Sequence, residues 1–301
     1  MHIGVIGLGK MGMNLVLNMK RHQAEVSAFD ISAERLAEAK EAGVPVYEDV
    51  ETLVQTLATP RAFWMMIPAG SAVDEVLAKI KPHLRSGDIV IDGGNSHFKD
   101  SVRRHEELAA LGVDFLDVGS SGGTSGALNG LCLMIGGPKS AYDKLEGLFI
   151  KLAVPNGCLY TGEAGSGHFL KMVHNGIEYG MMQAIAEGFE VLEKGPYTYD
   201  YEEVATVWNN GSVIRSWLME LMQNAFSKDE RLDKIRGVMH SSGEGKWTIE
   251  TALDYQVATP VIALSLLMRY RSLQEDTFAG KVVAALRNEF GGHAVVSADE
   301  S

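Results

Sequence analysis

The stretch HIGVIGLGKMG, from His2 to Gly12, decides the fold of this chain. Its first five residues are typical of a short buried strand, and GLGKMG follows with the spacing G-x-G-x-x-G. A helical pattern comes directly after it, so the motif has the strand, turn and helix that a dinucleotide-binding loop needs. In such a loop Gly7 permits the tight turn, Gly9 lets the backbone approach a diphosphate, and Gly12 allows close helix packing. The predicted cofactor-binding residues of this loop are Gly7, Leu8, Gly9, Lys10, Met11 and Gly12.

An acidic residue follows the second predicted strand. That strand, residues 25–29, ends directly before Asp30, which comes 18 residues after Gly12. A carboxylate at this place accepts hydrogen bonds from the ribose hydroxyls of NAD and repels the 2′-phosphate of NADP. The sequence therefore predicts NAD as the cofactor, with NADP as the less favoured alternative. The loop after the third strand is expected to line the cofactor with Ile67, Pro68 and Ala69.

Short β-rich runs alternate with helical patterns through the first half of the chain. Strands are predicted at residues 2–6, 25–29, 62–67, 88–92, 113–118, 131–135 and 158–160. This alternation is typical of a doubly wound, mostly parallel sheet with helices on both faces. After GEAGSG, residues 162–167, the pattern becomes helical and begins with a long helix near residues 168–193. We predict an α/β Rossmann domain, 1–164, that binds NAD, followed by an all-α domain, 165–301.

Four polar residues share one side of that long helix. Lys171, His174, Asn175 and Glu178 have the spacing i, i+3, i+4 and i+7, which puts them on one face. They offer an amine, an imidazole, an amide and a carboxylate, so we predict all four as catalytic candidates. Alone, the lysine is more often solvated and the histidine more often a core residue, but the group of four favours a functional site. The opposite side carries apolar residues and suits burial: Leu170, Val173, Ile177, Met181 and Ala184.

Two polar, glycine-rich runs follow predicted strands. DGGNS, residues 92–96, closes the fourth strand, and GSSGG, residues 119–123, closes the fifth. Open α/β sheets bind ligands at the carboxyl ends of their strands. We therefore expect Asn95 and Ser121 to add side-chain hydrogen bonds to a ligand, with Asn95 also near the cofactor.

Composition limits the possible partners. Asp and Glu number 39 against 27 Lys and Arg, a net charge of −12 that disfavours binding to nucleic acid. Cys132 and Cys158 fit neither a metal site nor a disulfide framework and are expected as core residues in a reducing compartment. No run approaches the roughly 18 apolar residues that span a bilayer. The N-terminus lacks the features of a signal peptide, so we predict a cytoplasmic protein without a membrane partner or a metal.

Basic residues that suit a phosphate group lie late in the chain. They are Lys246 in the turn GEGK, Arg269, and Arg287 with His293. Phosphate is bound by clustered donors of this kind, although each residue alone is more often a surface charge.

Six stretches, in this order, resemble decarboxylating 6-phosphogluconate dehydrogenase: GLGKMG, DGGNS, SGG, KMVHNGIEYG, GEGKWT and RNEFGGH. The resemblance extends from Gly7 to His293. A lysine and an asparagine at this spacing also occur in the wider β-hydroxyacid dehydrogenase superfamily, but His174, Glu178 and Tyr179 point to the phosphogluconate enzyme.

The resemblance implies a mechanism and a set of roles. Lys171 would deprotonate the C3 hydroxyl during hydride transfer, CO₂ would leave, and Glu178 would protonate C1 of the enediol to give ribulose 5-phosphate. Tyr179 and Arg269 would bind the substrate phosphate, and Arg287 and His293 would come from a neighbouring subunit of a homodimer or homotetramer. The second domain would thus bind substrate and mediate self-association in an enzyme of the pentose phosphate pathway and gluconate use. The residues implied to position the sugar acid are Asn95, Ser121, Gly122, Gly123, His174 and Asn175.

The chain also departs from the family pattern. It resembles the short form, without the additional C-terminal helical region of longer members. Those members have a basic residue just ahead of the GxGKWT turn, where this chain has Ser241-Ser242, so Lys246 is the candidate replacement in binding phosphate. Two alternatives remain open: a 3-hydroxyacid dehydrogenase of the 3-hydroxyisobutyrate type that does not decarboxylate, and a regulator that senses NAD without turnover.

Overall fold

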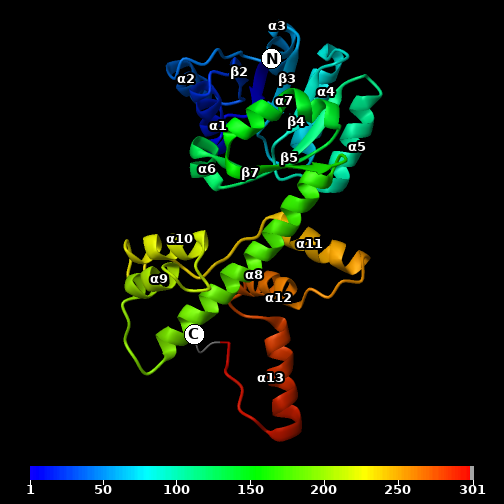
Figure 1. Cartoon of the computed structure of the whole chain (residues 1–301). Helices are drawn as coiled ribbons and strands as arrows, with labels where there is room; N and C mark the ends of the chain where they lie inside the picture. The colour runs from blue at the N-terminus through cyan, green and yellow to red at the C-terminus, as the bar shows by residue number, and fades with distance from the viewer. Residues whose placement is uncertain (299–301) are drawn as a thin grey trace. The chain divides into compact units, whose positions relative to one another are not determined.

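A seven-stranded sheet forms the centre of the first part of the chain in this computed structural model, which describes residues 1–298 (Figure 1). Each predicted strand is present, with ends that differ by a few residues. Apolar runs such as Ala62–Met65 are buried because the strand has a neighbour on each side and helices on both faces. The strands are β1 His2–Ile6, β2 Val26–Phe29, β3 Arg61–Met65, β4 Ile89–Asp92, β5 Asp114–Ser121, β6 Leu131–Gly136 and β7 Ala153–Gly162.

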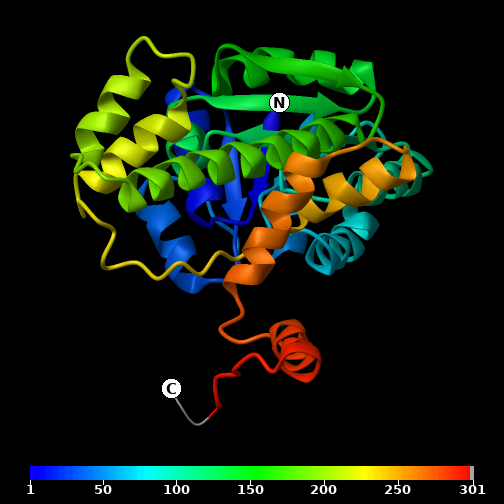
Figure 2. The same cartoon turned by 90° about the horizontal axis from the view of Figure 1, so that it is seen from below.

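The strand order confirms the doubly wound, mostly parallel sheet. It runs β2-β1-β3-β4-β5-β6-β7, and every neighbouring pair is parallel except the antiparallel pair of β5 and β6. β6 and β7 lie side by side at one edge, as Figure 2 shows. From β1 the chain first moves to β2 on one side and then to β3 on the other. The carboxyl ends of β1 and β3 therefore flank the switch point where such sheets bind a dinucleotide.

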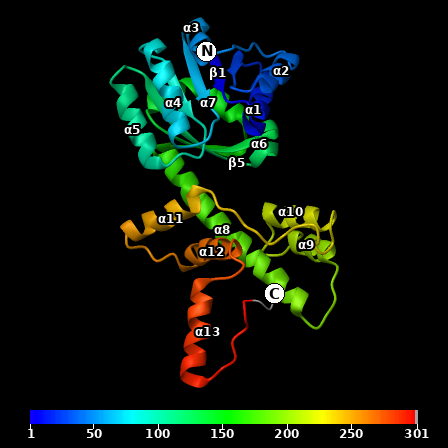
Figure 3. The ribbon, with the colours of Figure 1, turned by 180° about the vertical axis from the view of Figure 1, so that it is seen from behind.

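Helices cover both faces of the sheet and bury two apolar cores. Side chains of α1, α2, α6 and α7 pack on one face, and those of α3, α4 and α5 pack on the other. Figure 1 views the sheet from the side of α7, and Figure 3 from the side of α4 and α5. The helices are α1 Lys10–Arg21, α2 Ala33–Glu41, α3 Val50–Thr56, α4 Ser71–Ile80, α5 Phe98–Ala109, α6 Gly123–Asn129 and α7 Lys139–Leu152, with a short 3₁₀ helix at Lys81–His83.

A long helix, α8 Ser166–Lys194, follows β7. The chain divides into two compact units within it: the first is Met1–Asn175 and the second begins at Gly176. Lys171 therefore belongs to the unit that contains the sheet. The predicted boundary between 164 and 165 stays a prediction, and residues 299–301 of the predicted second domain lie outside the described residues.

The second unit is built from helices. A core of Phe189, Tyr201, Ala205, Met219 and Phe226 joins α8 to α9 and α10. α13, by contrast, has no buried residue. These helices are α9 Tyr201–Asn209, α10 Trp217–Phe226, α11 Gly243–Asp254, α12 Pro260–Ser272 and α13 Phe278–Gly291.

The expected burial of the apolar side of α8 is wrong for the single chain. Leu170, Ile177, Met181 and Ala184 are exposed, with 53% of Ile177 accessible, whereas the polar residues Lys171 and Asn175 are buried. Within the first unit, β5 packs against the polar side of α8, at Lys171, and this contact explains the burial there. Among residues 1–298, no helix combines the length and the apolar character needed to cross a membrane.

Candidate active site

The loop between β1 and α1 has the glycines that a dinucleotide site requires. Gly7 has a φ of +98°, and a Cβ on it would lie 2.5 Å from the carbonyl oxygen of Met66. A Cβ on Gly12 would overlap the carbonyl oxygen of Gly7. A Cβ on Gly9, in contrast, would meet no protein atom within 4 Å. The protein itself thus requires glycine at positions 7 and 12, whereas position 9 is open in the way that close approach of a ligand needs.

The start of α1 is suited to an anion. Its N-cap is Gly9, which provides no side-chain cap, and no acidic residue lies in the first turn. The backbone N–H groups there are therefore available to a diphosphate, which the helix dipole also favours. Beside them, the half-buried Asp30 accepts hydrogen bonds from the N–H groups of Leu8 and Ser32. Each carboxylate oxygen keeps a lone pair for a ribose hydroxyl, so the residues present fit NAD.

Replacing Gly9 by alanine is expected to weaken NAD binding at least about tenfold, since the new methyl group would occupy the space of the diphosphate. The free energy of unfolding should fall by less than about 1 kcal/mol, because the methyl meets no protein atom. Gly12→Ala is the comparison: its overlap with Gly7 should cost about 1–3 kcal/mol of stability. Calorimetric titration with NAD and chemical denaturation measure the two effects. Unchanged NAD affinity in Gly9→Ala would contradict the assignment of this loop as the binding site for the NAD diphosphate.

A buried arginine joins the loops after β3 and β4. Arg104 of α5 donates to the carboxylate of Asp92 at 3.2 Å and to the carbonyl oxygen of Gly70 at 3.0 Å. It also binds Asp74 at 2.8 Å, and this hydrogen bond lowers the pKa of that carboxyl group. Asp92 accepts further hydrogen bonds from Gly94 and Ser96 on either side of the exposed Asn95. The loop Ile67–Gly70 and the residue Asn95 are therefore held together at the carboxyl edge of the sheet.

The run Gly119–Gly123 differs from the expected turn. Gly119 and Ser121 belong to β5, because β6 pairs with this segment in an antiparallel register. The turn begins only at Gly122, which has a φ of +119°, and Gly123 is the first residue of α6. Ser121 therefore lies at the last position of a strand, where its backbone is fixed by pairing with Cys132.

Three of the four polar residues of α8 form a hydrogen-bonded group. The amide oxygen of Asn175 accepts from Lys171 Nζ at 2.8 Å and lies 2.9 Å from His174 Nδ1. Because an amide oxygen only accepts, Nδ1 of His174 is the donor in this contact. The NH₂ group of Asn175 then remains as a donor. Lys171 is 6% exposed and Asn175 8% exposed, so the amine is largely shielded from water.

Glu178 follows on the same helix. It lies seven residues after Lys171, about two turns further along, and is half-buried. Within residues 1–298 no hydrogen bond or ion pair holds its carboxyl group in one orientation. One side of α8 thus carries an amine and a carboxyl group at a spacing of roughly 10 Å along the helix axis.

A second group surrounds Tyr179 in the helical unit. The guanidinium of Arg269 lies 3.6 Å from the centroid of the Tyr179 ring, a cation–π contact. The Tyr179 hydroxyl accepts from the N–H of Ser242 at 3.1 Å and lies 3.2 Å from its Oγ. Two predicted phosphate residues, Tyr179 and Arg269, are therefore in contact, and Ser242 joins them.

Lys246 is not part of this group. It lies on the exposed side of α11 and pairs with Glu250 at 3.4 Å. Its neighbours Glu244 and Gly245 face the interior instead, and a Cβ on Gly245 would lie 2.5 Å from the Tyr179 ring. The exposed pair with Glu250 gives no support to Lys246 as the replacement for a missing basic residue.

Arg287 and His293 are exposed at the end of α13 and beyond it. Asn288 donates to the carbonyl oxygen of His293 at 2.9 Å, which fixes the turn after the helix. In the described part of the chain, no hydrogen bond, ion pair or ring contact joins Arg287 or His293 to Tyr179 or Arg269.

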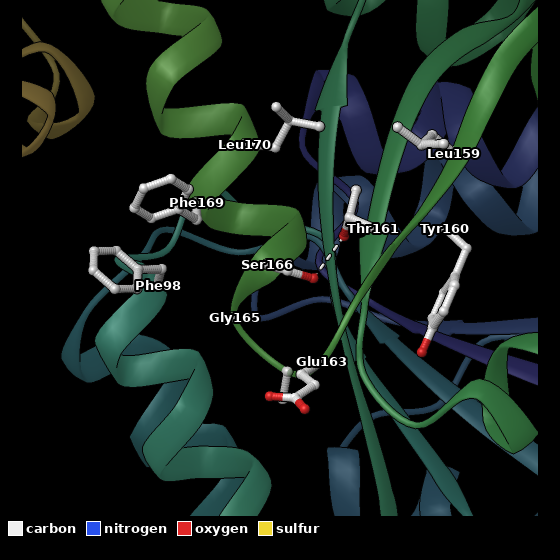
Figure 4. Close-up of a pocket in the computed structure, with 10 residues that line it drawn as sticks. Phe98, Leu159, Tyr160, Thr161, Glu163, Gly165, Ser166, Phe169 and Leu170 are labelled. Atoms are coloured by element: carbon white, nitrogen blue, oxygen red, sulfur yellow. Dashed lines mark hydrogen bonds between the residues drawn. The ribbon is translucent and has the colours of Figure 1, made fainter.

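A pocket of the first unit lies away from these predicted site residues. It has a volume of about 550 Å³ and lies beside the start of α8 (Figure 4). Phe98 and Phe169 meet there edge to face, and Thr161 and Ser166 hydrogen-bond on the opposite wall, as Figure 4 shows. None of the predicted site residues lines this pocket.

Matches to two family domains cover almost the whole chain. Residues 2–162 match the NAD binding domain of 6-phosphogluconate dehydrogenase, and residues 167–300 match the C-terminal domain of 6-phosphogluconate dehydrogenase. The chain belongs to the 6-phosphogluconate dehydrogenase family. The resemblance drawn from the sequence motifs is therefore confirmed.

Individual relatives of the 6-phosphogluconate dehydrogenase family agree with this assignment. A provisionally named 6-phosphogluconate dehydrogenase of Bacillus subtilis is 57% identical, over 98% of this chain and 99% of the relative. The NAD(+)-dependent, decarboxylating 6-phosphogluconate dehydrogenase of Haloferax volcanii is 46% identical, with all of both chains covered. Among solved structures, the Plasmodium falciparum 6-phosphogluconate dehydrogenase, described with NADP+ and with 6-phosphogluconate, has a TM-score of 0.84 and 33% identity. The match covers all of this chain and 67% of that one.

The structure shows three buried polar residues near the predicted site residues that the sequence motifs did not reveal. Arg104, Asp117 and His168 are all buried and lie next to predicted site residues. A signal for Asp117 was present, since a carboxylate inside the apolar run VDFLDV requires a partner. Nothing local identifies that partner, because the hydrogen-bonding groups come from residues 165 and 168.

Proposed function

We propose that this chain catalyses the NAD-dependent oxidative decarboxylation of 6-phosphogluconate to ribulose 5-phosphate and CO₂. Family membership and the NAD(+)-dependent relative support this activity and this cofactor. The observation that carries the proposal is the buried Lys171 amine, which is hydrogen-bonded to Asn175 and followed two turns later by Glu178.

Lys171 acts as the base. Its amine takes the proton of the C3 hydroxyl while C3 loses its hydride, and bound NAD supplies the acceptor for that hydride. The ketone formed at C3 is β to the carboxylate, so the bond to CO₂ breaks and its electron pair forms the enediol. Protonated Lys171 donates a hydrogen bond to the C3 oxygen during this step and stabilises its developing charge.

Glu178 acts as the acid that completes the reaction. Its carboxyl group delivers a proton to C1 of the enediol, which gives ribulose 5-phosphate. The i, i+7 spacing places it on the same side of α8 as Lys171, beyond His174 and Asn175. The Asn175 NH₂ group and His174 Nε2 bind hydroxyl groups of the sugar acid between the two ends. Asn95, Ser121, Gly122 and Gly123 complete the contacts to the substrate.

Tyr179 and Arg269 bind the phosphate at the far end of the substrate. The contact with the ring and a hydrogen bond from Arg269 Nη1 to the carbonyl oxygen of His240 at 2.9 Å hold the guanidinium beside Tyr179. We expect its other N–H groups to donate to the phosphate. Ser242 adds a hydroxyl group where longer members of the family have a basic residue.

An absorbance assay at the reduced nicotinamide band tests the function directly. 6-Phosphogluconate with NAD should give rapid turnover, and NADP should give a lower kcat/KM because Asp30 repels its 2′-phosphate. Turnover of 3-hydroxyisobutyrate in place of 6-phosphogluconate would favour the alternative dehydrogenase. NAD binding by calorimetry without turnover of any sugar acid would favour the regulator.

We also propose that the active enzyme is a homo-oligomer. α13 exposes a continuous apolar set, including Phe278 at 82% and Phe290 at 77%. A helix with apolar residues and no buried side chain needs another surface to cover it. A second copy that covers α13 brings Arg287 and His293 to a neighbouring active site. Cys132 is exposed and Cys158 is half-buried, so the expectation that both cysteines are core residues is wrong. Both are free thiols, which suits a cytoplasmic location.

Mixing two inactive variants is expected to restore activity. In a dimer with shared sites, a hybrid of Lys171→Met and Arg287→Ala has both defects in one site and an intact second site. Half of the dimers are hybrids after random exchange, so about a quarter of wild-type activity should return. The measurement is the rate of NAD reduction with 6-phosphogluconate after equal amounts of the two variants have been unfolded and refolded together. No recovery, with hybrids demonstrated by mass spectrometry, would show that Arg287 acts within its own chain.

A further inference from the structure

Asp117 lies in the middle of β5 and is fully buried. Both of its carboxylate oxygens bind backbone N–H groups at the start of α8: Oδ1 accepts from Gly165, directly before the helix, at 2.7 Å, and Oδ2 accepts from His168 at 2.8 Å. Hydrogen bonds to an ionised carboxylate are roughly twice as strong as those between neutral groups. The carboxylate also lies at the positive end of the helix dipole. Asp117 therefore fixes the start of α8 to the sheet.

Glycines on both sides of this contact allow the helix to approach the strand closely. Asp117 and Gly119 are two residues apart on β5, so they lie on the same face of the strand. A Cβ on Gly119 would overlap the Cβ of Lys171. On the helix, a Cβ on Gly167 would lie 2.6 Å from the carbonyl oxygen of Met134 and would overlap that of Asp117. The stem of Lys171 thus lies directly on the strand whose carboxylate binds the helix start.

His168 strengthens the same junction. Its ring is 1% exposed, and Nδ1 lies 2.7 Å from the hydroxyl oxygen of Ser101 on α5. The backbone N–H of this residue binds Asp117. The first turn of α8 therefore has contacts to a strand and to a second helix of the unit that carries the glycine loop.

We propose that Asp117 is the positioning residue for Lys171: through α8 it sets where the amine lies in the NAD-binding unit. This inference rests on the proposed role of Lys171 as the base. Asp117 is fully buried, and both of its carboxylate oxygens accept backbone hydrogen bonds, so it acts on the chemistry only through the helix. Its carboxylate acts one helical turn away, where a displacement of about 1 Å can reduce the rate about 100-fold.

Asp117→Asn tests this role. An amide keeps one accepting oxygen but turns its NH₂ group toward the second backbone N–H, so one hydrogen bond is lost. We expect kcat to fall about 10- to 100-fold while the KM for NAD stays within about threefold. Amide hydrogen exchange at residues 165–168 should accelerate at least about tenfold. Asp114→Asn is the matched control on the same strand, because that carboxylate is more exposed and pairs with Lys144 at 3.3 Å.

The outcomes are separable. Faster exchange with an unchanged kcat would show that Asp117 only stabilises the helix, and unchanged exchange would show that it does not hold the helix; either result overturns the proposal. A wild-type protein that does not turn over 6-phosphogluconate would contradict the proposed function, whereas the exchange measurement would still report on the junction.

Gly119→Ala provides a second variant if Asp117→Asn does not fold. It keeps the carboxylate of Asp117, but the new methyl group would overlap the Cβ of Lys171 and would lie 3.0 Å from the carbonyl oxygen of Gly167, so the start of α8 has to move away from β5. We expect kcat to fall about 10-fold or more. The control is Gly147→Ala on α7, where an added Cβ meets no protein atom within 4 Å. A kcat in Gly119→Ala equal to that of Gly147→Ala would contradict the close positioning.

Discussion

Replacing Lys171 by methionine is expected to lower kcat for 6-phosphogluconate oxidation by at least about 10³-fold, because the C3 hydroxyl loses its base. The fold should be retained. Methionine is unbranched and fills the space of the lysine stem above Gly119. The amide oxygen of Asn175 also keeps its second donor, since His174 Nδ1 lies 2.9 Å away. Initial rates measure catalysis and calorimetric titration measures substrate binding. The rate should be lost while the dissociation constant for 6-phosphogluconate changes by less than about tenfold.

Lys144→Met is the matched control for this variant. Lys144 lies in the same unit, is exposed and pairs with Asp114 at the surface. Such pairs contribute about 1 kcal/mol or less, so neither activity nor stability should change measurably. Near-normal turnover by Lys171→Met would refute the assignment of the base.

Glu178→Gln is expected to lower kcat by about 10²- to 10⁴-fold, because the enediol formed after CO₂ loss no longer receives its proton. The amide has the same shape as the acid, so the helix should be unaffected. A second measurement isolates the proton transfer: the wild-type enzyme should exchange the C1 hydrogen of ribulose 5-phosphate with deuterium from the solvent. The variant should lose this exchange, which mass spectrometry or proton NMR detects.

Glu187→Gln on the same helix is the control for Glu178→Gln. Glu187 is exposed and accepts one hydrogen bond from Gln183 at 2.8 Å. Its loss should leave both turnover and C1 exchange intact. If Glu178→Gln exchanged the C1 hydrogen as fast as wild type, another group would have to be the acid.

The sequence predicted those parts of the site that depend on local spacing. The glycine loop follows from a strand, a turn and a helix within 12 residues, and its steric reasons are present in the structure at Gly7 and Gly12. The grouping of Lys171, His174 and Asn175 follows from the period of one helix. Both cases need only the geometry of consecutive residues, which the backbone fixes.

Long-range contacts were beyond such reasoning. Arg104 reaches Asp92 across 12 positions of the chain, and Asp117 reaches His168 across 51. The apolar side of α8 was predicted as buried, but periodicity identifies a side and not the surface that covers it. Lys246 was a candidate because of its charge, and only the orientation of α11 shows that Glu244 and Gly245 face inward instead.

The junction of β5 and α8 has a consequence for how this scaffold can diversify. At positions 119 and 167 even a methyl group collides with neighbouring atoms. Any residue with a Cβ at either position would force α8 away from β5. The position of the Lys171 amine therefore depends on glycine at both positions. New substrate preferences in enzymes of this architecture have to arise further along the helix and in the loops, where side chains can be exchanged one at a time.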